Sequence, residues 1–194
     1  VSSVTPPLGP ERGGTRVAVL GAGFRDAYTL RCRFDNASSA VTGWVGVQLS
    51  SVSGALSSGG SFYYHAPLQV SGVAPPLGPE RGGTRVAVLG SGFRDAYTLR
   101  CRFDNASGAV LARYVDASQL ECVTPLHSLG AKLVLVSMNA QQYSGGGGGV
   151  RYTYQAAAAV SSVPPSVAAA EGGAAPAVPA ADQRAATEGP CYRT

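Results

Sequence analysis

Lysine, histidine and long apolar runs are scarce in this sequence. Of 194 residues only Lys132 is a lysine, and only His65 and His127 are histidines. Neither histidine has a cysteine or another histidine at metal-ligand spacing, so we expect no metal site. No nucleophile-elbow motif or repeated carboxylate pair accompanies them, so we expect no enzyme, no cofactor and no small-molecule substrate. No apolar run approaches the roughly 18 residues that a membrane span requires, so we expect no span in this sequence.

Charge is sparse as well, with 15 Lys+Arg against 11 Asp+Glu and a net charge of +4. A hydrophobic fraction of 45% still suffices for a packed core. Gly (26) and Pro (13) fall short of the excess typical of a collagen-like or wholly disordered chain. The sequence begins at Val1 without a Met or a signal-like segment, and we expect a mature or excised piece of a longer protein.

An internal repeat organises the chain. Residues 1–41 and 70–110 align without gaps, and 37 of the 41 positions are identical. Residues 160–165 resemble the beginning of the first copy and mark the start of a third. The last region is rich in Ala and Pro and has almost no large apolar residue, so we expect it to be disordered. We therefore expect a truncated repeat at 1–69, a complete repeat at 70–155 and a tail at 156–194.

The first repeat is 21 residues shorter than the second. Residues 45–49 resemble 133–137, and residues 61–64 resemble 151–154, so the gap falls near 111–131. We expect the first repeat to lack two strands, to leave an open sheet edge that a neighbour must cover, and to be unstable as an isolated segment.

The repeats are predicted to consist of short strands. Residues 97–103 alternate, with Tyr97, Leu99, Cys101 and Phe103 on one face of a strand. Gly and other turn residues bound the β-branched run at 84–89 and recur at the spacing of a sandwich. Because no segment has a helical period, the predicted fold class is all-β.

The string Val-x-x-Val-x-Pro-Pro-Leu-Gly-Pro-Glu-Arg-Gly-Gly-Thr-Arg-Val-x-Val-x-Gly-x-Gly-Phe occurs at 1–24 and at 70–93. It resembles the IPT/TIG domain, an immunoglobulin-like fold shared by plexins and transcription factors. Further residues of the second repeat fit that family in order and spacing: Cys101-x-Phe103, Leu120-x-Cys122-x-Thr124-Pro125, Leu133–Val136 and Tyr152-x-Tyr154. The resemblance implies tandem immunoglobulin-like β-sandwiches, of which the first lacks the Cys-x-Thr-Pro strand pair.

The four cysteines allow three full pairings. Cys101 and Cys122 lie on adjacent strand patterns with both side chains predicted inward, and their bridge would stabilise the fold by roughly 3 kcal/mol. Two buried free thiols are the alternative. Cys32 occupies the position of Cys101, but its partner falls in the gap, and the pairing of Cys32 and Cys191 stays open.

Asn36-Ala37-Ser38 and Asn105-Ala106-Ser107 are N-glycosylation sequons at equivalent positions of the two repeats. Together with the cysteine pair and the scarcity of lysine, they favour the secretory route. We therefore expect an extracellular or cell-surface location. An association with a cilium or a cell wall does not follow from the sequence.

Four arginines raise the question of nucleic acid, because Arg31 and Arg33 recur as Arg100 and Arg102 on the predicted solvent face of one strand. Each duplicated 41-residue segment carries a net charge of +2. The positive charge is thus one pattern counted twice, and a solvated strand face explains it better than phosphate contacts.

The predicted function is a non-catalytic extracellular or cell-surface module of tandem repeats that binds other protein chains or neighbouring repeats, or serves their assembly. The alternative is an intracellular IPT/TIG dimerisation module of a DNA-binding transcription factor. Candidate contact residues are the aromatic side chains Trp44, Tyr63, Tyr64 and Tyr143, and the alternative, which we expect for most of them, is packing in a core.

Overall fold

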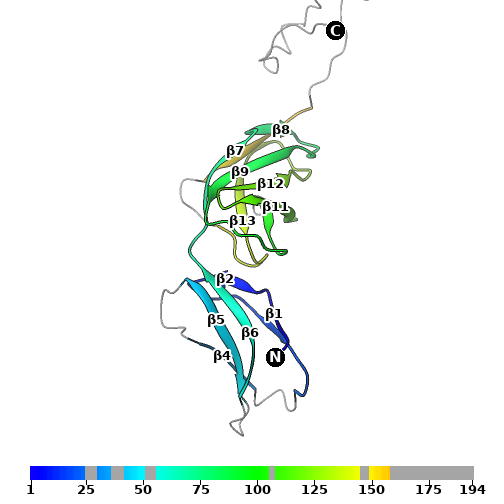
Figure 1. The fold of residues 1–194 in the computed structure, drawn as a ribbon. Coiled ribbons are helices and arrows are strands. Elements are labelled where there is room, and N and C mark those ends of the chain that lie inside the picture. The colour runs from blue at the N-terminus through cyan, green and yellow to red at the C-terminus, as the bar shows by residue number, and fades with distance from the viewer. Residues whose placement is uncertain (25–29, 36–41, 51–55, 105–107, 145–148, 158–194) are drawn as a thin grey trace, which may run out of the picture. The chain divides into compact units, whose positions relative to one another are not determined.

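The computed structural model describes residues 1–24, 30–35, 42–50, 56–104, 108–144 and 149–157. Every regular element among these residues is a β-strand (Figure 1), so the all-β prediction is confirmed. Residues Val1–Gln155 form one compact unit. The predicted disordered tail lies, from residue 158 onward, outside the described residues.

The first repeat contains two separate sheets. Strands β1 (Ser3–Thr5) and β3 (Ala18–Leu20) pair antiparallel. The second sheet has the order β2-β6-β5-β4 (Figure 1), with β2 parallel to β6. Its strands are β2 (Leu8–Pro10), β4 (Arg31–Phe34), β5 (Gly43–Ser50) and β6 (Leu56–His65). A small core of Val4, Val45, Val47 and Phe62 lies between the sheets.

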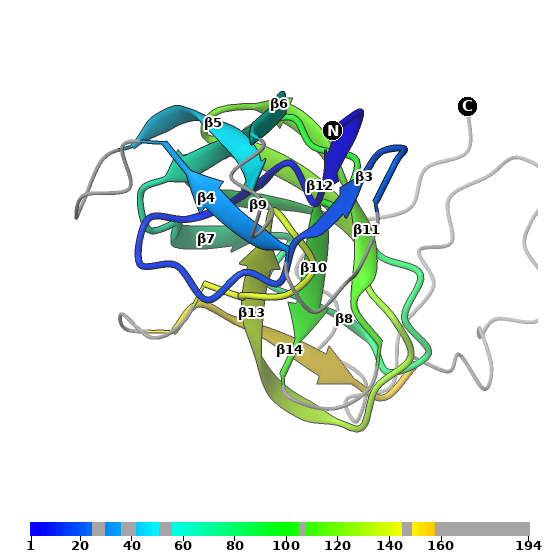
Figure 2. The same cartoon turned by 90° about the horizontal axis from the view of Figure 1, so that it is seen from below.

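The second repeat joins eight strands in one continuous sheet of order β7-β9-β12-β11-β10-β13-β14-β8. Figure 2 shows β13 beside β14, with which it pairs. The strands are β7 (Gln69–Ala74), β8 (Leu77–Pro79), β9 (Arg85–Ser91), β10 (Arg100–Phe103), β11 (Val110–Asp116), β12 (Gln119–Val123), β13 (Gly130–Ser137) and β14 (Arg151–Gln155). Apolar and aromatic side chains that alternate along these strands fill its core.

Strand pairing shows which residues of the two repeats correspond. Phe34 pairs with Val47, and its counterpart Phe103 pairs with Val134. The expected match of residues 45–49 with 133–137 is therefore wrong by one residue. Residues 133–136 are apolar on both faces of the strand, so alternation could not define the register there. The expected match of 61–64 with 151–154 is confirmed, since Leu8 pairs with Tyr63 as Leu77 pairs with Thr153.

The two sheets of the first repeat stay separate because the β11–β12 hairpin has no counterpart among its described residues. In the second repeat β9 pairs with β7 and β12, and β10 pairs with β13 and β11. Among the described residues, β3 pairs with β1 alone and β4 with β5 alone. The predicted truncation of the first sandwich is thus confirmed, and it leaves two strand edges without a partner strand in the described part of the chain.

Candidate functional site

The strands left without this hairpin carry apolar side chains that are exposed in the first repeat and buried in the second. Phe24 is 45% exposed, whereas its counterpart Phe93 is 1% exposed. Cys32 is exposed, whereas Cys101 is fully buried. We call β3, β4 and Phe24 the open edge. Exposed apolar surface beside unpaired strand edges favours contact with another chain.

At the end of the first repeat that contacts the second, side-chain amides of the second repeat bind backbone groups of the first. Gln141 Oε1 accepts a hydrogen bond from the Arg16 N–H at 2.9 Å, and Gln141 Nε2 donates to the Arg16 carbonyl at 2.8 Å. Gln142 Nε2 donates to the Gly14 carbonyl at 2.8 Å. The Gln141 amide thus satisfies both backbone groups of Arg16, as a neighbouring strand would do.

The corresponding turn of the second repeat is covered by its own chain. The Thr84 N–H donates to Thr124 Oγ1 at 3.1 Å, and the Gly83 N–H donates to the Thr124 carbonyl at 2.8 Å. A Cβ atom on Gly82 would lie 2.5 Å from the Pro125 carbonyl carbon, whereas one on Gly13 would meet no described atom within 4 Å. Residues 141–142 therefore contact the turn that the Thr-Pro segment contacts in the second repeat, but they bond different backbone atoms of it.

Asn139 holds the loop that carries these amides. Its Oδ1 accepts hydrogen bonds from the Gln141 and Gln142 N–H groups at 3.0 and 3.1 Å and from Ser137 Oγ at 3.1 Å. Its Nδ2 donates to Thr15 Oγ1 at 3.2 Å. The repeat pattern of the sequence did not predict this junction. Its signal is the run of amides at 139–142 directly after a buried strand, which the first repeat lacks.

Two of the predicted contact residues form a cluster with Arg94, in which Trp44 and Arg94 are exposed and Tyr63 is partly buried against the larger core. The rings of Trp44 and Tyr63 meet edge to face with centroids 5.3 Å apart. The Arg94 guanidinium lies 4.1 Å from the Tyr63 ring centroid and donates to the Tyr63 hydroxyl at 3.1 Å. Trp44 is exposed. Trp, Tyr and Arg are the side chains enriched at the energetic centres of protein interfaces, so this cluster fits the predicted role.

The structure places the other two predicted contact residues differently. Tyr64 is partly buried and packs edge to face against Phe34 and Phe62 in the core of the first repeat. The half-buried Tyr143 lies under Arg102, whose guanidinium carbon is 4.0 Å from the ring centroid. Neither ring is as free as Trp44 to meet another molecule.

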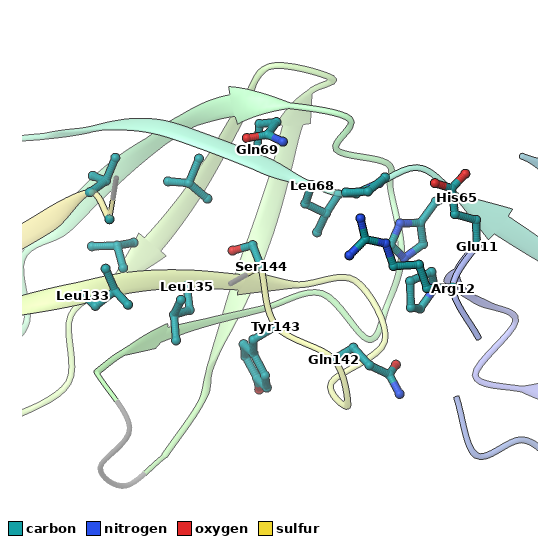
Figure 3. Close-up of a pocket in the computed structure, with 16 residues that line it drawn as sticks. Glu11, Arg12, His65, Leu68, Gln69, Leu133, Leu135, Gln142, Tyr143 and Ser144 are labelled. Carbon is teal, nitrogen blue, oxygen red and sulfur yellow. The ribbon is translucent and has the colours of Figure 1, made fainter. Parts of the chain in front are cut away.

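A cavity of about 440 Å³ lies beside His65, between residues 10–12 and residues 133–135 (Figure 3). His65 is buried, and its Nδ1–H donates to the Ala66 carbonyl at 2.8 Å. Burial lowers the pKa of His65, and the Ala66 hydrogen bond and the charge of Glu11 oppose that effect. The described residues contain no group of three or more His, Cys, Asp or Glu side chains that could hold a metal.

Cys101 and Cys122 form a disulfide with their Cα atoms 6.4 Å apart, and both are buried. The expectation that their strands are adjacent is wrong. Strand β11, one of the two strands expected near 111–131, lies between β10 and β12 in the sheet order. The bond therefore crosses the interior of the sandwich. Cys191 and both sequon asparagines, Asn36 and Asn105, lie outside the described residues.

The four strand arginines do not form one basic surface of free side chains. Arg102 stacks on Tyr143, and Arg100 Nη1 donates to the Leu99 carbonyl at 2.8 Å. Arg31 and Arg33 are exposed, and Arg33 lies 4.0 Å from an Asp35 oxygen. An exposed pair of this kind contributes little to stability. In the part of the chain that the structure describes, no helix is long and apolar enough to cross a membrane.

Comparison with known proteins gives a family and a fold. The model of the IPT/TIG domain family matches residues 1–64 and 68–154. A solved structure of the Plexin A4 full extracellular region, domains 1 to 10, is 20% identical with a TM-score of 0.56, and the match covers 84% of this chain and 16% of that one. A second structure of that region, with domains 1 to 8, is 20% identical with a TM-score of 0.48 and covers 78% and 18%. A comparison with curated protein sequences finds no match.

Proposed function

Because the chain belongs to the IPT/TIG domain family, we propose that it is a non-catalytic module that mediates contacts between proteins outside the cell. The observation that carries this proposal is the cluster of Trp44, Tyr63 and Arg94, in which the exposed Trp44 and Arg94 side chains lie against the partly buried Tyr63 ring. Its three side chains are held against one another before any partner binds. A preformed cluster loses little side-chain entropy on binding, so most of its contact energy is retained.

Three features support the extracellular location. A buried disulfide persists in oxidising compartments and is rare in the cytosol. Two sequons recur at equivalent positions. The fold is similar to that of the Plexin A4 full extracellular region, although this chain spans only 16% of that protein. We retain 1–69, 70–155 and 156–194 as the proposed division of the chain.

The alternative, a dimerisation module of an intracellular transcription factor, has less support. The disulfide would not persist in a reducing compartment. Of the four arginines that suggested phosphate contacts, Arg100 and Arg102 are engaged by their own repeat. Glycan mass on Asn36 or Asn105 in protein from its natural source would support the secretory route. Unmodified asparagines together with reduced Cys101 and Cys122 would contradict it.

Binding to intact cells tests the contact function. We expect the fluorescently labelled chain to bind saturably to cells of its source organism, and protease treatment of those cells to abolish the binding. Trp44→Ala should weaken binding about tenfold or more, because it removes the most exposed ring of the cluster. Tyr97→Ala is the matched control, since Tyr97 is an exposed aromatic residue outside the cluster. Equal losses in both variants, or binding that survives protease, would contradict the proposal.

A further inference from the structure

We propose that the open edge of the first repeat binds a two-stranded β-hairpin of another protein, in the way that the second repeat binds its own β11–β12 hairpin. The inference deepens the proposed function by naming the kind of partner and the place where it binds. It rests on a comparison of the two repeats. Both contain the same pair of strands, and in the second repeat the β11–β12 hairpin of the chain itself pairs with them.

The surface that holds the hairpin is present in both repeats. Residues 15–35 and 84–104 differ only at Ala22, which is Ser91 in the second repeat. In that repeat β12 pairs along β9, with Leu120 opposite Val88 and Cys122 opposite Val86. The corresponding residues of the first repeat are Val19 and Val17, which are half-buried instead of fully buried. The first repeat therefore has the receptor surface for such a hairpin.

The second repeat also indicates the width of the missing element. One strand of the hairpin, β12, pairs with β9, and the other, β11, pairs with β10 through Leu111 and Val110. The hairpin thereby joins the two sheets. In the first repeat β3 and β4 each have an unpaired edge among the described residues. A partner that covers both edges as the hairpin does in the second repeat supplies two antiparallel strands, because two strands lie between β9 and β10 there.

The chemistry of the partner follows from the residues that face it. The strand along β3 should place apolar side chains opposite Val17 and Val19, with a cysteine within reach of Cys32. Its outward side should carry an acidic residue, because Glu121 lies 3.7 Å from Arg85, the counterpart of Arg16.

A second copy of this chain is a poorer occupant. Among the described residues, its hairpin of this kind is already built into its own second repeat, where Leu120 is fully buried and Cys122 is in a disulfide. We therefore assign the site to a hairpin of a different protein.

The direct test uses a synthetic peptide of residues 108–124 with its cysteine replaced by serine. It is titrated into the full chain carrying Cys191→Ser. We expect saturable binding that the peptide change Leu120→Asp weakens at least about tenfold, because this residue would face Val19. Gln119→Asp in the peptide is the matched control and should change affinity less than about threefold, since Gln119 pairs with the outward residue Leu89. Equal affinity of the two altered peptides, or no binding, would overturn the proposal.

A matched pair of changes in the protein tests the same site. Phe24→Asp should abolish peptide binding, because Phe93 at the equivalent position is buried beneath the hairpin side of the sandwich. Leu20→Asp should preserve it, because Leu20 is 53% exposed and its counterpart Leu89 remains 39% exposed with the hairpin present. Both changes are at exposed positions, and circular dichroism would verify that each variant folds. If Leu20→Asp abolishes binding while Phe24→Asp preserves it, the proposed face is wrong.

Cys32 provides a covalent readout. The peptide with its natural cysteine is supplied as a mixed disulfide with thionitrobenzoate. The Cys32 thiolate attacks the peptide sulfur, a Cys32–peptide disulfide forms, and thionitrobenzoate leaves as a thiolate with the electron pair of the broken bond. We expect this exchange to be at least about tenfold faster than exchange with the Leu120→Asp peptide. Equal rates would overturn the proposal.

Two further outcomes separate this inference from the proposed function. If the chain alone forms a dimer that Phe24→Asp dissociates, a second copy covers the open edge and the hairpin proposal is overturned. If no peptide binds while cell binding stays sensitive to Trp44→Ala, the hairpin proposal fails and the contact function stands. If the peptide binds but cell binding does not depend on Trp44, the contact function fails and the hairpin proposal stands.

Discussion

Residues 16–24 and 85–93 have nearly the same sequence but different surroundings. In the second repeat Val86 and Val88 are fully buried, because β12 covers them. The corresponding Val17 and Val19 are only half-buried in the first repeat. Their hydropathy is the same in both places. The difference shows that burial is a property of the neighbours a strand acquires, here of two strands that one repeat has and the other lacks.

A second pair of identical residues differs in the opposite direction. Leu8 of the first repeat is 6% exposed and belongs to the larger core cluster, whereas Leu77 of the second repeat is 46% exposed. The second repeat thus buries Leu8, whereas no described residue buries Phe24 or Cys32 to the same extent. The first repeat thus packs against the second repeat at one end, while the apolar residues of its open edge stay exposed. We expect this arrangement of a module that is joined permanently to one neighbour and binds another protein reversibly.

The largest expected effect comes from removing one aromatic ring from each repeat. Phe93→Ala should lower the free energy of unfolding by about 4 kcal/mol, because it leaves a cavity in a packed core. Phe24→Ala should cost about 1 kcal/mol or less, because its ring is already partly in water. Denaturant unfolding of both variants measures the two values. Similar losses would mean that the two copies share one environment, contrary to the structure.

The disulfide should have the next largest effect. Replacing Cys101 and Cys122 together by alanine should lower the free energy of unfolding by about 3 kcal/mol, because the bond closes a loop with a sequence separation of 21. Cys32→Ala is the control and should leave stability almost unchanged, since Cys32 is exposed and unbonded. Thermal unfolding under non-reducing conditions compares them. A cost for Cys32→Ala as large as that of the pair would contradict this assignment.

The sequence was sufficient to predict what depends on local pattern. Alternation and turn residues indicated strands, and the internal repeat located the gap that β11 and β12 fill in the second copy. It was insufficient where two faces of a strand are alike, as in 133–136, whose register was wrong by one residue. It also could not predict which of the four aromatic candidates packs in a core, as Tyr64 does, or that Gln141 pairs with Arg16. Those contacts depend on which distant segment of the chain packs against these residues in the folded protein.

The junction amides give a smaller and more local effect. Gln141→Ala removes the acceptor of the Arg16 N–H and the donor to its carbonyl. Loss of bonds worth about 1 kcal/mol should speed amide exchange at Arg16 about fivefold. Arg85 provides the internal control, because the side chain of Gln141 is bonded to the first repeat and β12 covers Arg85. Hydrogen exchange by NMR measures both sites, and an equal change at Arg85 would indicate a global loss of stability.

The smallest expected effect is a difference in pH dependence. Burial lowers the pKa of His65 below its usual value near 6.5, with the Ala66 carbonyl and Glu11 opposing. His65 therefore binds a proton more readily in the unfolded chain than in the folded chain. Protonation then favours unfolding, so His65 should reduce the free energy of unfolding as the pH falls below about 6.5. His65→Gln copies Gln155, which occupies the equivalent position of the second repeat. Because both proteins keep the same carboxylates, the difference between their unfolding free energies from about pH 8 to about pH 5 isolates the histidine. We expect wild type to lose stability relative to His65→Gln over this interval, and a constant difference would show that burial does not lower the pKa of His65.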